Sequence, residues 1–248
     1  MLKTYGIIGF PLQHSFSQKY FTGKFATEGI TDCVYRNFPI PAIGKLPELL
    51  SLETSLIGLN VTIPYKKSVL GYLDRREKLP EGLDACNCIR IQNGELIGYN
   101  TDVIGFERSL LPLLEQQHTQ ALILGNGGAA EAVRFVLHKL GIPYRVVSRK
   151  LQAGTSLTYA DLDESVIRSH TLIINTTPLG TFPEVETYPD IPYSFLSKNH
   201  LLYDLVYNPA KTVFLQKGEA AGAAIKNGYE MLLIQAEESW RIWNENQD

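Results

Sequence analysis

The clearest change between apolar and polar stretches lies between residues 122 and 148. A short apolar run, 122–124, ends at Gly125, which is typical of a buried strand that enters a turn. The next segment has one apolar helical face, formed by Ala132, Val133, Val136, Leu137 and Leu140. Gly141 and Pro143 end this helix, and the apolar residues of 144–147 predict a second strand. The pattern therefore predicts a strand, a glycine turn, a helix and a second strand in succession.

The amino-terminal part of the chain has an alternation of its own. Its pattern predicts strands at 3–9, 33–38 and 56–61, and a hairpin of 85–92 with 95–99 around Asn93-Gly94. It also predicts helices at 15–29, 41–51, 65–73 and 103–114. We therefore expect residues 1–101 to form an open α/β domain.

The carboxyl-terminal part predicts strands at 172–176 and 201–206, an edge strand at 224–226 and a helix at 211–221. Residues 151–157 are short and polar where a full crossover helix is expected. We therefore expect residues 102–228 to form a parallel, doubly wound, Rossmann-type domain. The last helix, within 229–248, has an apolar face that fits packing back on the amino-terminal domain, formed by Leu232, Leu233, Ala236, Trp240 and Trp243.

Composition excludes several classes of protein. With 248 residues, 44% of them hydrophobic, the chain is long enough for two domains with ample cores. A net charge of −3 favours neither nucleic acid nor a membrane surface as partner. Neither a membrane span nor a signal peptide is predicted. The three cysteines lack the spacing of a disulfide framework or a metal site, so we expect reduced thiols, no metal and a cytoplasmic location.

The glycine turn carries the first candidate chemistry. Gly125, Gly127 and Ala130 fit G-x-G-x-x-A between a strand and a helix, the pattern of a dinucleotide-binding turn. The first glycine permits the tight turn, and the second lets the backbone approach a pyrophosphate. The free N–H groups at the start of the helix favour the phosphates. The alternative is a tight turn that binds no ligand.

The end of the second strand indicates which dinucleotide binds. An NAD site usually places an acidic residue there for the ribose 2′-hydroxyl, but this chain has Ser148-Arg149-Lys150. The guanidinium of Arg149 can grip a 2′-phosphate with paired N–H donors. We therefore predict NADP rather than NAD as cofactor. The alternative is that both cations are merely solvated.

Polar residues gather at the predicted strand ends of the amino-terminal part. Ser15 and Ser17 begin a helix, where hydroxyls can bind a carboxylate, although Ser15 with Gln18 also fits a capping box. Lys66 lies in the first turn of a predicted helix, a position that the helix dipole disfavours for a solvated cation. Asp102 precedes the predicted helix 103–114 and could simply cap it.

Taken together, the motifs resemble one family, shikimate dehydrogenase, the NADP-dependent enzyme that reduces 3-dehydroshikimate. The resemblance rests on Gly6-Ile7-Ile8-Gly9-x-Pro11-x-x-His14-Ser15-x-Ser17, Gly58-x-Asn60-Val61-Thr62-x-Pro64-x-Lys66, Ala85-x-Asn87, Gly98-x-Asn100-Thr101-Asp102, the glycine turn, Asn175-Thr176-Thr177-Pro178-x-Gly180, Tyr203-Asp204-x-x-Tyr207 and Asn227-Gly228-x-x-Met231-Leu232-x-x-Gln235. It implies a substrate domain at 1–101, completed by helix 229–248, and a cofactor domain at 102–228.

The resemblance also implies a role for individual residues. Lys66 and Asp102 would be the catalytic pair, with Lys66 as acid and base. Ser15 and Ser17 would bind the substrate carboxylate. The substrate's hydroxyls would be bound by Asn60, Thr62, Asn87, Asp102, Tyr207 and Gln235. The cofactor would be bound by Gly125, Asn126, Gly127, Gly128, Ala129, Ser148, Arg149, Lys150 and Gly228. Asn87 on a hairpin edge and Gln235 facing solvent are the alternatives for those two residues.

Three features depart from the family pattern. Lys150 replaces a hydroxyl residue, the helix expected after this loop looks shortened, and Glu230 stands where the family usually has glycine. Three rival functions stay open: a quinate or broad-range shikimate/quinate dehydrogenase, a non-catalytic NADP-binding redox sensor, and another two-domain reductase such as a folate-linked dehydrogenase. We expect a small-molecule substrate, no nucleic-acid or membrane partner, and a monomer or homodimer.

Overall fold

The computed structural model describes residues 2–12 and 16–245. The chain divides into two units. Unit 1 runs to Thr101 and resumes at Gln235, and unit 2 spans Asp102–Ile234. The first division coincides with the expected boundary after residue 101. The second falls at 234/235 rather than 228/229, because the final helix starts in one unit and continues in the other.

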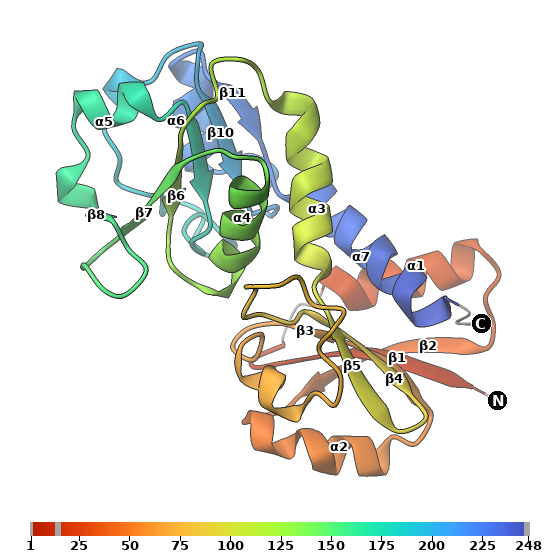
Figure 1. Ribbon diagram of the computed structural model, residues 1–248. Coiled ribbons are helices and arrows are strands. Elements are labelled where there is room, and N and C mark those ends of the chain that lie inside the picture. Colours follow the sequence, from red (N-terminus) through yellow and green to blue (C-terminus); the bar gives the residue numbers. More distant parts are fainter. Residues whose placement is uncertain (1, 13–15, 246–248) are drawn as a thin grey trace. The chain divides into compact units, whose positions relative to one another are not determined.

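Unit 1 is built on a five-stranded sheet with the order β2-β1-β3-β4-β5 (Figure 1). Its strands are β1 (Lys3–Gly9), β2 (Cys33–Pro39), β3 (Leu56–Val61), β4 (Cys88–Gln92) and β5 (Glu95–Tyr99). Strand β1 pairs in parallel with β2 and β3, and β4 is antiparallel to both of its neighbours. The hairpin turn has positive φ at Asn93 and Gly94, 52° and 84°, as a two-residue hairpin connection requires.

Both faces of this sheet are covered, which explains the continuous apolar run of β1. Ile8 packs into a core with helix α2 (Leu46–Leu52), preceded by a 3₁₀ turn at Ile43–Lys45. Tyr5 and Ile7 face the opposite core, shared with α1 (Phe16–Thr27) and α7 (Tyr229–Asn244) (Figure 1). The parallel part of the sheet therefore lies between two layers of helix.

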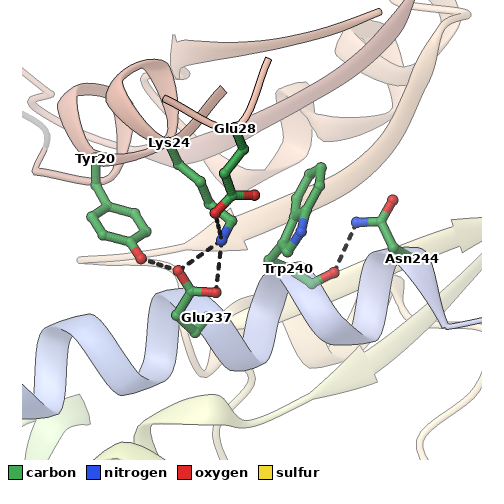
Figure 2. Close-up of polar contacts among 6 residues, drawn as sticks. All are labelled: Tyr20, Lys24, Glu28, Glu237, Trp240 and Asn244. Carbon is green, nitrogen blue, oxygen red and sulfur yellow. Dashed lines mark hydrogen bonds and ion pairs between the residues drawn. The ribbon is translucent and has the colours of Figure 1, made fainter. Parts of the chain in front are cut away.

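Helix α7 is fixed to unit 1 by aromatic and charged contacts. The indole of Trp243 donates to the carbonyl of Ile89 at 3.0 Å. Gly58 leaves room for this ring, because a Cβ there would lie 2.6 Å from it. On the outer side, Figure 2 shows Glu237 of α7 accepting hydrogen bonds from Tyr20 and from Lys24, the latter at 3.0 Å. These contacts join α7 to α1, which carries Ser17.

One predicted helix of unit 1 is wrong. Residues 65–73 contain only a 3₁₀ turn, Ser68–Tyr72, in place of an α-helix. The N–H groups of Leu70 and Leu73 bond to carbonyls three residues back, at 3.2 and 3.3 Å. Gly71, with no side chain, disfavours the α-helical conformation at this point.

Unit 2 contains a six-stranded, wholly parallel sheet with the order β11-β10-β9-β6-β7-β8. Its strands are β6 (Ala121–Leu124), β7 (Tyr144–Ser148), β8 (Leu157–Thr158), β9 (Leu172–Asn175), β10 (Leu201–Asp204) and β11 (Ala224–Lys226). The strand order reverses between β6 and β9, which is the arrangement of a doubly wound dinucleotide-binding domain. The predicted fold class is confirmed.

The helices of unit 2 are α3 (Thr101–Leu110, its first residue in unit 1), α4 (Gly128–Lys139), α5 (Glu164–Ser169) and α6 (Val213–Ala220), with 3₁₀ turns at Leu111–Leu113, Tyr159–Asp161 and Tyr193–Phe195. Helix α3 ends earlier than predicted, because Pro112 cannot continue the hydrogen-bonding pattern. Between β7 and β9 the crossover holds only β8, a 3₁₀ turn and the short α5. Over residues 2–12 and 16–245, no helix has the length and apolar character needed to cross a membrane.

A buried carboxylate ends strand β10. Asp204 is fully buried and accepts hydrogen bonds from Asn175 Nδ2 at 2.9 Å and Thr212 Oγ1 at 2.6 Å. Burial raises the pKa of Asp204 to about 6, against an ordinary value of 3.8. The native state therefore binds a proton more tightly than the unfolded chain, and this contribution to stability is lost as the pH rises through 6.

We expect Asp204→Asn to flatten the pH dependence of the unfolding free energy. The contribution of Asp204 is present below its unfolded pKa of 3.8 and lost above its native value of about 6, a change of about 3 kcal/mol. Chemical denaturation of the parent and the variant from pH 4 to pH 7 measures it. Asp190→Asn, at an exposed position, is the control and should leave the profile unchanged. If the unfolding free energy of Asp204→Asn varies with pH as steeply as that of the parent, Asp204 is not the group responsible for the pH dependence.

Candidate active site

Gly125 and Gly127, in the turn between β6 and α4, are glycine for different reasons. Gly125 has φ +106°, and a Cβ there would lie 2.8 Å from Thr176 Oγ1, so the fold itself requires glycine. Gly127 is the N-cap of α4 with φ −92°, which any residue adopts. Apart from the adjoining backbone, no atom of the described residues lies within 4 Å of the place its Cβ would take. The space beside Gly127 is therefore open for a ligand that contacts backbone.

A cavity of about 690 Å³ opens at this turn within unit 2. It is lined by Gly125, Asn126, Gly127, Ser148, Arg149, Lys150, Gln152, Tyr159, Thr176, Thr177, Pro178 and Leu179. The cavity thus lies at the carboxyl ends of β6, β7 and β9, where the strand order reverses and open α/β sheets bind ligands. A dinucleotide fits this place, since no side chain caps the start of α4 and its first N–H groups can receive phosphate.

Six of the predicted cofactor residues line this cavity, and three do not. Gly128 and Ala129 form the first turn of α4, next to the lining residue Gly127. Gly228 is explained by packing instead, because a Cβ there would lie 2.2 Å from the carbonyl oxygen of Leu205. Glu230, the departure from the family pattern, is exposed and pairs with Lys226.

The rim of the cavity is basic. Arg149 and Lys150 are exposed, and Ser148 donates its hydroxyl hydrogen to the carbonyl of Lys150. None of the lining residues is acidic. Burial raises the pKa of the Tyr159 hydroxyl, while the charge of Arg149 lowers it, which places the guanidinium near this ring. The rim can therefore neutralise a phosphate group, and it lacks the carboxylate that would hold a ribose 2′-hydroxyl.

Unit 1 contains a buried cluster of polar side chains at the centre of its sheet. Asn60, at 5% exposure, accepts a hydrogen bond from Tyr35 at 2.8 Å and donates to Ser239 at 3.0 Å. Burial raises the pKa of Tyr35, while the side chain of Ser17 acts to lower it, which puts Ser17 beside the Tyr35 hydroxyl. Four elements of unit 1 supply these groups: β3, β2, α7 and α1. Amides and hydroxyls of this kind both donate and accept, which suits a ligand rich in hydroxyl groups.

The cluster continues through Asn87 and Thr101. Asn87 Oδ1 accepts from the N–H of Thr101 at 2.6 Å, and its Nδ2 donates to Thr101 Oγ1 at 3.0 Å. Thr101 Oγ1 also contacts Gln235 Oε1 at 3.4 Å and Ser239 Oγ at 3.3 Å. Gln235 is 7% exposed, so its solvent-facing alternative is wrong, and Asn87, directly before β4 at the edge of the hairpin, is itself only 3% exposed. The structure brings Ser17, Asn60, Asn87 and Gln235 into one network.

The predicted catalytic residues belong to different segments. Lys66 is half-buried and follows β3, and its carbonyl accepts the N–H of Cys86 at 2.8 Å. Because no α-helix begins at Lys66, the helix-dipole argument for this residue is wrong. Asp102 is 7% exposed and lies inside the first turn of α3, which begins at Thr101. Both residues remain candidates on the family resemblance.

The remaining predicted residues are Thr62, Tyr207 and Ser15. Gly9 allows the end of β1 to approach Thr62, since a Cβ at residue 9 would lie 2.5 Å from the Thr62 methyl group. Tyr207 is half-buried in unit 2, and burial raises its pKa. Ser15 lies outside the described residues. Among the described residues, no cluster of His, Cys, Asp or Glu has the makeup of a metal site.

Proteins of known function are similar to this chain over nearly its whole length. The family model for the shikimate dehydrogenase substrate binding domain matches residues 7–89. A shikimate dehydrogenase (NADP(+)) of Methanococcus maripaludis is 35% identical over 273 residues, covering 97% of this chain and 91% of the relative. The chain belongs to the shikimate dehydrogenase family. As a member it is an oxidoreductase, so the prediction of an enzyme of this family is confirmed.

Solved members of the shikimate dehydrogenase family share the whole fold. The Thermus thermophilus enzyme, in complex with NADP(H) and shikimate, has a TM-score of 0.84 at 28% identity, covering 98% of this chain and 94% of that one. Quinate dehydrogenase from Corynebacterium glutamicum, in complex with NAD, has a TM-score of 0.84 at 26% identity with the same coverage. The neighbours therefore include enzymes named for either substrate and described with either cofactor.

Several residues of the two sites were not predicted from the sequence. In unit 2, Thr176, Thr177, Pro178 and Leu179 line the cavity, and their motif directly after a buried strand was a usable signal. Gln152 and Tyr159 lie in an irregular segment that carries no such signal. In unit 1, Ser239 lies one helical turn after Gln235, on the same face of α7, so its place could have been inferred.

Proposed function

We propose that this chain catalyses the reversible reduction of 3-dehydroshikimate to shikimate with NADPH, a step of aromatic amino-acid biosynthesis. The buried polar cluster of unit 1 carries the proposal, since a dinucleotide cavity alone is common to many oxidoreductases. Amides and hydroxyls held in place by mutual hydrogen bonds can exchange those partners for the hydroxyl groups of a polyhydroxylated acid. The free thiols of Cys33, Cys86 and Cys88 are consistent with a reducing cytoplasm as the location. The proposed enzyme is a monomer or a homodimer.

In this proposal the cofactor site is the cavity of unit 2. The backbone N–H groups of the glycine turn, Gly125–Ala129, hold the pyrophosphate. Arg149 and Lys150, with the hydroxyl of Ser148, hold the 2′-phosphate. The relatives named as NADP-dependent support the same cofactor. When bound, NADPH supplies the hydride that reduces the ketone.

The substrate residues of the proposal are those of unit 1 with Tyr207. Ser15 and Ser17 bind the carboxylate, which hydroxyls and the N–H groups at the start of a helix both favour. The hydroxyl groups of the ring are bound by Asn60, Thr62, Asn87, Tyr207 and Gln235. Since the cluster is buried, each hydrogen bond to substrate forms away from competing water, which strengthens its contribution to specificity.

Lys66 and Asp102 carry the proton chemistry of the proposal. As the ketone is reduced, its oxygen gains negative charge, and the Lys66 ammonium stabilises that charge and donates the proton. The Asp102 carboxylate orients the ammonium and accepts a hydrogen bond from the neighbouring substrate hydroxyl. In the reverse direction, neutral Lys66 removes the hydroxyl proton.

Initial rates of reduced nicotinamide formation test the proposal. Purified protein is offered shikimate or quinate, each with NADP or NAD, and absorbance is followed. We expect rapid turnover with shikimate and NADP only. Turnover that favours quinate or NAD would move the chain toward the quinate dehydrogenases among its neighbours. Cofactor binding without any turnover would contradict the proposal and favour a redox sensor.

We expect Arg149→Ala to weaken NADP binding about 10- to 100-fold and NAD binding less than about twofold. A charge-assisted bond to phosphate contributes about 1.5–3 kcal/mol, and only NADP has the 2′-phosphate. Fluorescence titration with each cofactor measures the effect. Arg145→Ala is the matched control, an exposed arginine on β7, the strand that leads to Arg149, and it does not line the cavity. Equal weakening of both cofactors would contradict the role.

A further inference from the structure

The side chain of Asn126 is engaged with a neighbouring loop. Its Nδ2 donates to the carbonyl of Ala153 at 3.1 Å, and its Oδ1 accepts a hydrogen bond from Arg134. Both functions of the amide are therefore used by the protein. Although Asn126 lines the cavity, its backbone N–H is the group that can serve a phosphate.

Arg134 joins helix α4 to the same loop. Its Nη2 donates to the carbonyl of Gly154 at 2.9 Å as well as to Asn126, and Glu131 lies 3.7 Å from its Nη1. The Arg134 side chain is 17% exposed, with its bond to Asn126 partly buried and its bond to Gly154 at the surface. It thus ties the glycine turn to the loop that follows β7.

The loop itself is shaped to present these carbonyls. Gln152 and Thr155 close a turn, with the N–H of Thr155 bonded to the carbonyl of Gln152 at 3.0 Å and the N–H of Gln152 bonded to Thr155 Oγ1 at 2.8 Å. Gly154 takes the left-handed conformation at φ +78°, and a Cβ there would lie 3.3 Å from Arg134 Nη1. Arg149 and Lys150 lie just before this turn on the same loop.

We propose that Arg134 and the side chain of Asn126 form a latch that holds residues 149–155 against the start of α4, and so set the preference for a cofactor with a 2′-phosphate. The inference rests on the proposed function. When the anchors of an irregular loop are removed, the loop becomes ordered only on binding its ligand. The entropy cost of that ordering weakens the affinity for the ligand. Only the contacts of Arg149 and Lys150 depend on that order, whereas the glycine turn is fixed by β6 and α4. Arg134 is a positioning residue.

Two nucleotides that differ only in the 2′-phosphate, 2′,5′-ADP and 5′-AMP, test the latch by calorimetry. We expect Arg134→Gln and Asn126→Ala each to weaken 2′,5′-ADP about five- to tenfold and 5′-AMP less than about twofold. Asn126→Ala changes no charge, so it separates the latch from simple loss of a cation. Because both residues serve one latch, the double variant should be little weaker than either single variant. Arg134→Lys should restore part of the affinity.

Lys139→Ala, an exposed cation on the same helix paired with Glu107, is the control and should bind both nucleotides like the parent. If the parent prefers 2′,5′-ADP and both latch variants bind it with unchanged affinity, the latch is overturned while the proposed NADP site stands. Equal weakening of both nucleotides would also overturn it, since the latch would then serve the glycine turn. A parent protein that does not prefer 2′,5′-ADP would overturn the proposed NADP site together with the latch. Asn126→Ala carries the test if Arg134→Gln does not fold.

Discussion

Replacing Lys66 by alanine should lower kcat for shikimate oxidation by about 10²–10⁴-fold, the usual contribution of a positioned acid–base group. The alkoxide that develops on the substrate oxygen would lose both its proton donor and its nearest stabilising charge. The binding constants of shikimate and NADP should change by less than about threefold, because the polar cluster of unit 1 and the cavity of unit 2 stay intact. Steady-state kinetics and equilibrium titration of the variant measure the two effects separately.

Lys67→Ala provides the matched control for Lys66. Lys67 is the next residue along the chain, is exposed, and has the same side chain, so any general effect of removing a cation here appears in both variants. We expect Lys67→Ala to keep kcat within about twofold of the parent. A Lys66→Ala variant with normal folding and undiminished kcat would remove Lys66 from the mechanism.

Local chemistry explains why six of the residues that line the cavity of unit 2 could be named from the sequence. The glycine turn, the flanking strand and helix, and Arg149 lie within one continuous stretch, 121–149, and each reports on its own surroundings. Gly125 is an example, because its positive φ and its close approach to Thr176 allow no residue other than glycine at this position. The side chain of Asn126 was not predictable in the same way. Its partners, Arg134 and Ala153, depend on a loop whose path no periodic pattern describes.

The candidate substrate residues of unit 1 could be named from the sequence, but the network that joins them could not. Asn60, Asn87 and Gln235 were named from the family resemblance, yet nothing in their own neighbourhoods shows that they are buried together. Ser239 shares a helix face with Gln235, but its bond to Asn60 crosses 179 residues of sequence and that of Tyr35 crosses 25, so neither bond could be inferred. Long-range pairing of this kind follows from strand order, which apolar periodicity does not determine.

Asp102→Asn should lower kcat about 10²–10³-fold and raise KM for shikimate. Asparagine keeps the size of the side chain and its capacity to accept one hydrogen bond, but it loses the charge that orients Lys66 and grips a substrate hydroxyl. Because asparagine is also a good residue near the start of a helix, the stability of α3 should change by less than about 1 kcal/mol. Kinetics with shikimate and thermal unfolding of the same preparation measure the two effects.

Glu107→Gln is the control for Asp102, a carboxylate on the same helix that pairs with Lys139 and lies outside the proposed chemistry. It should leave kcat unchanged, while loss of stability without loss of kcat in Asp102→Asn would assign Asp102 to the helix alone. The double variant Lys66→Ala/Asp102→Asn decides whether the pair acts as one unit. If Asp102 works through Lys66, removing both should cost little more in kcat than removing Lys66. Additive losses would instead mean that Asp102 acts on the substrate hydroxyl independently of the proton transfer.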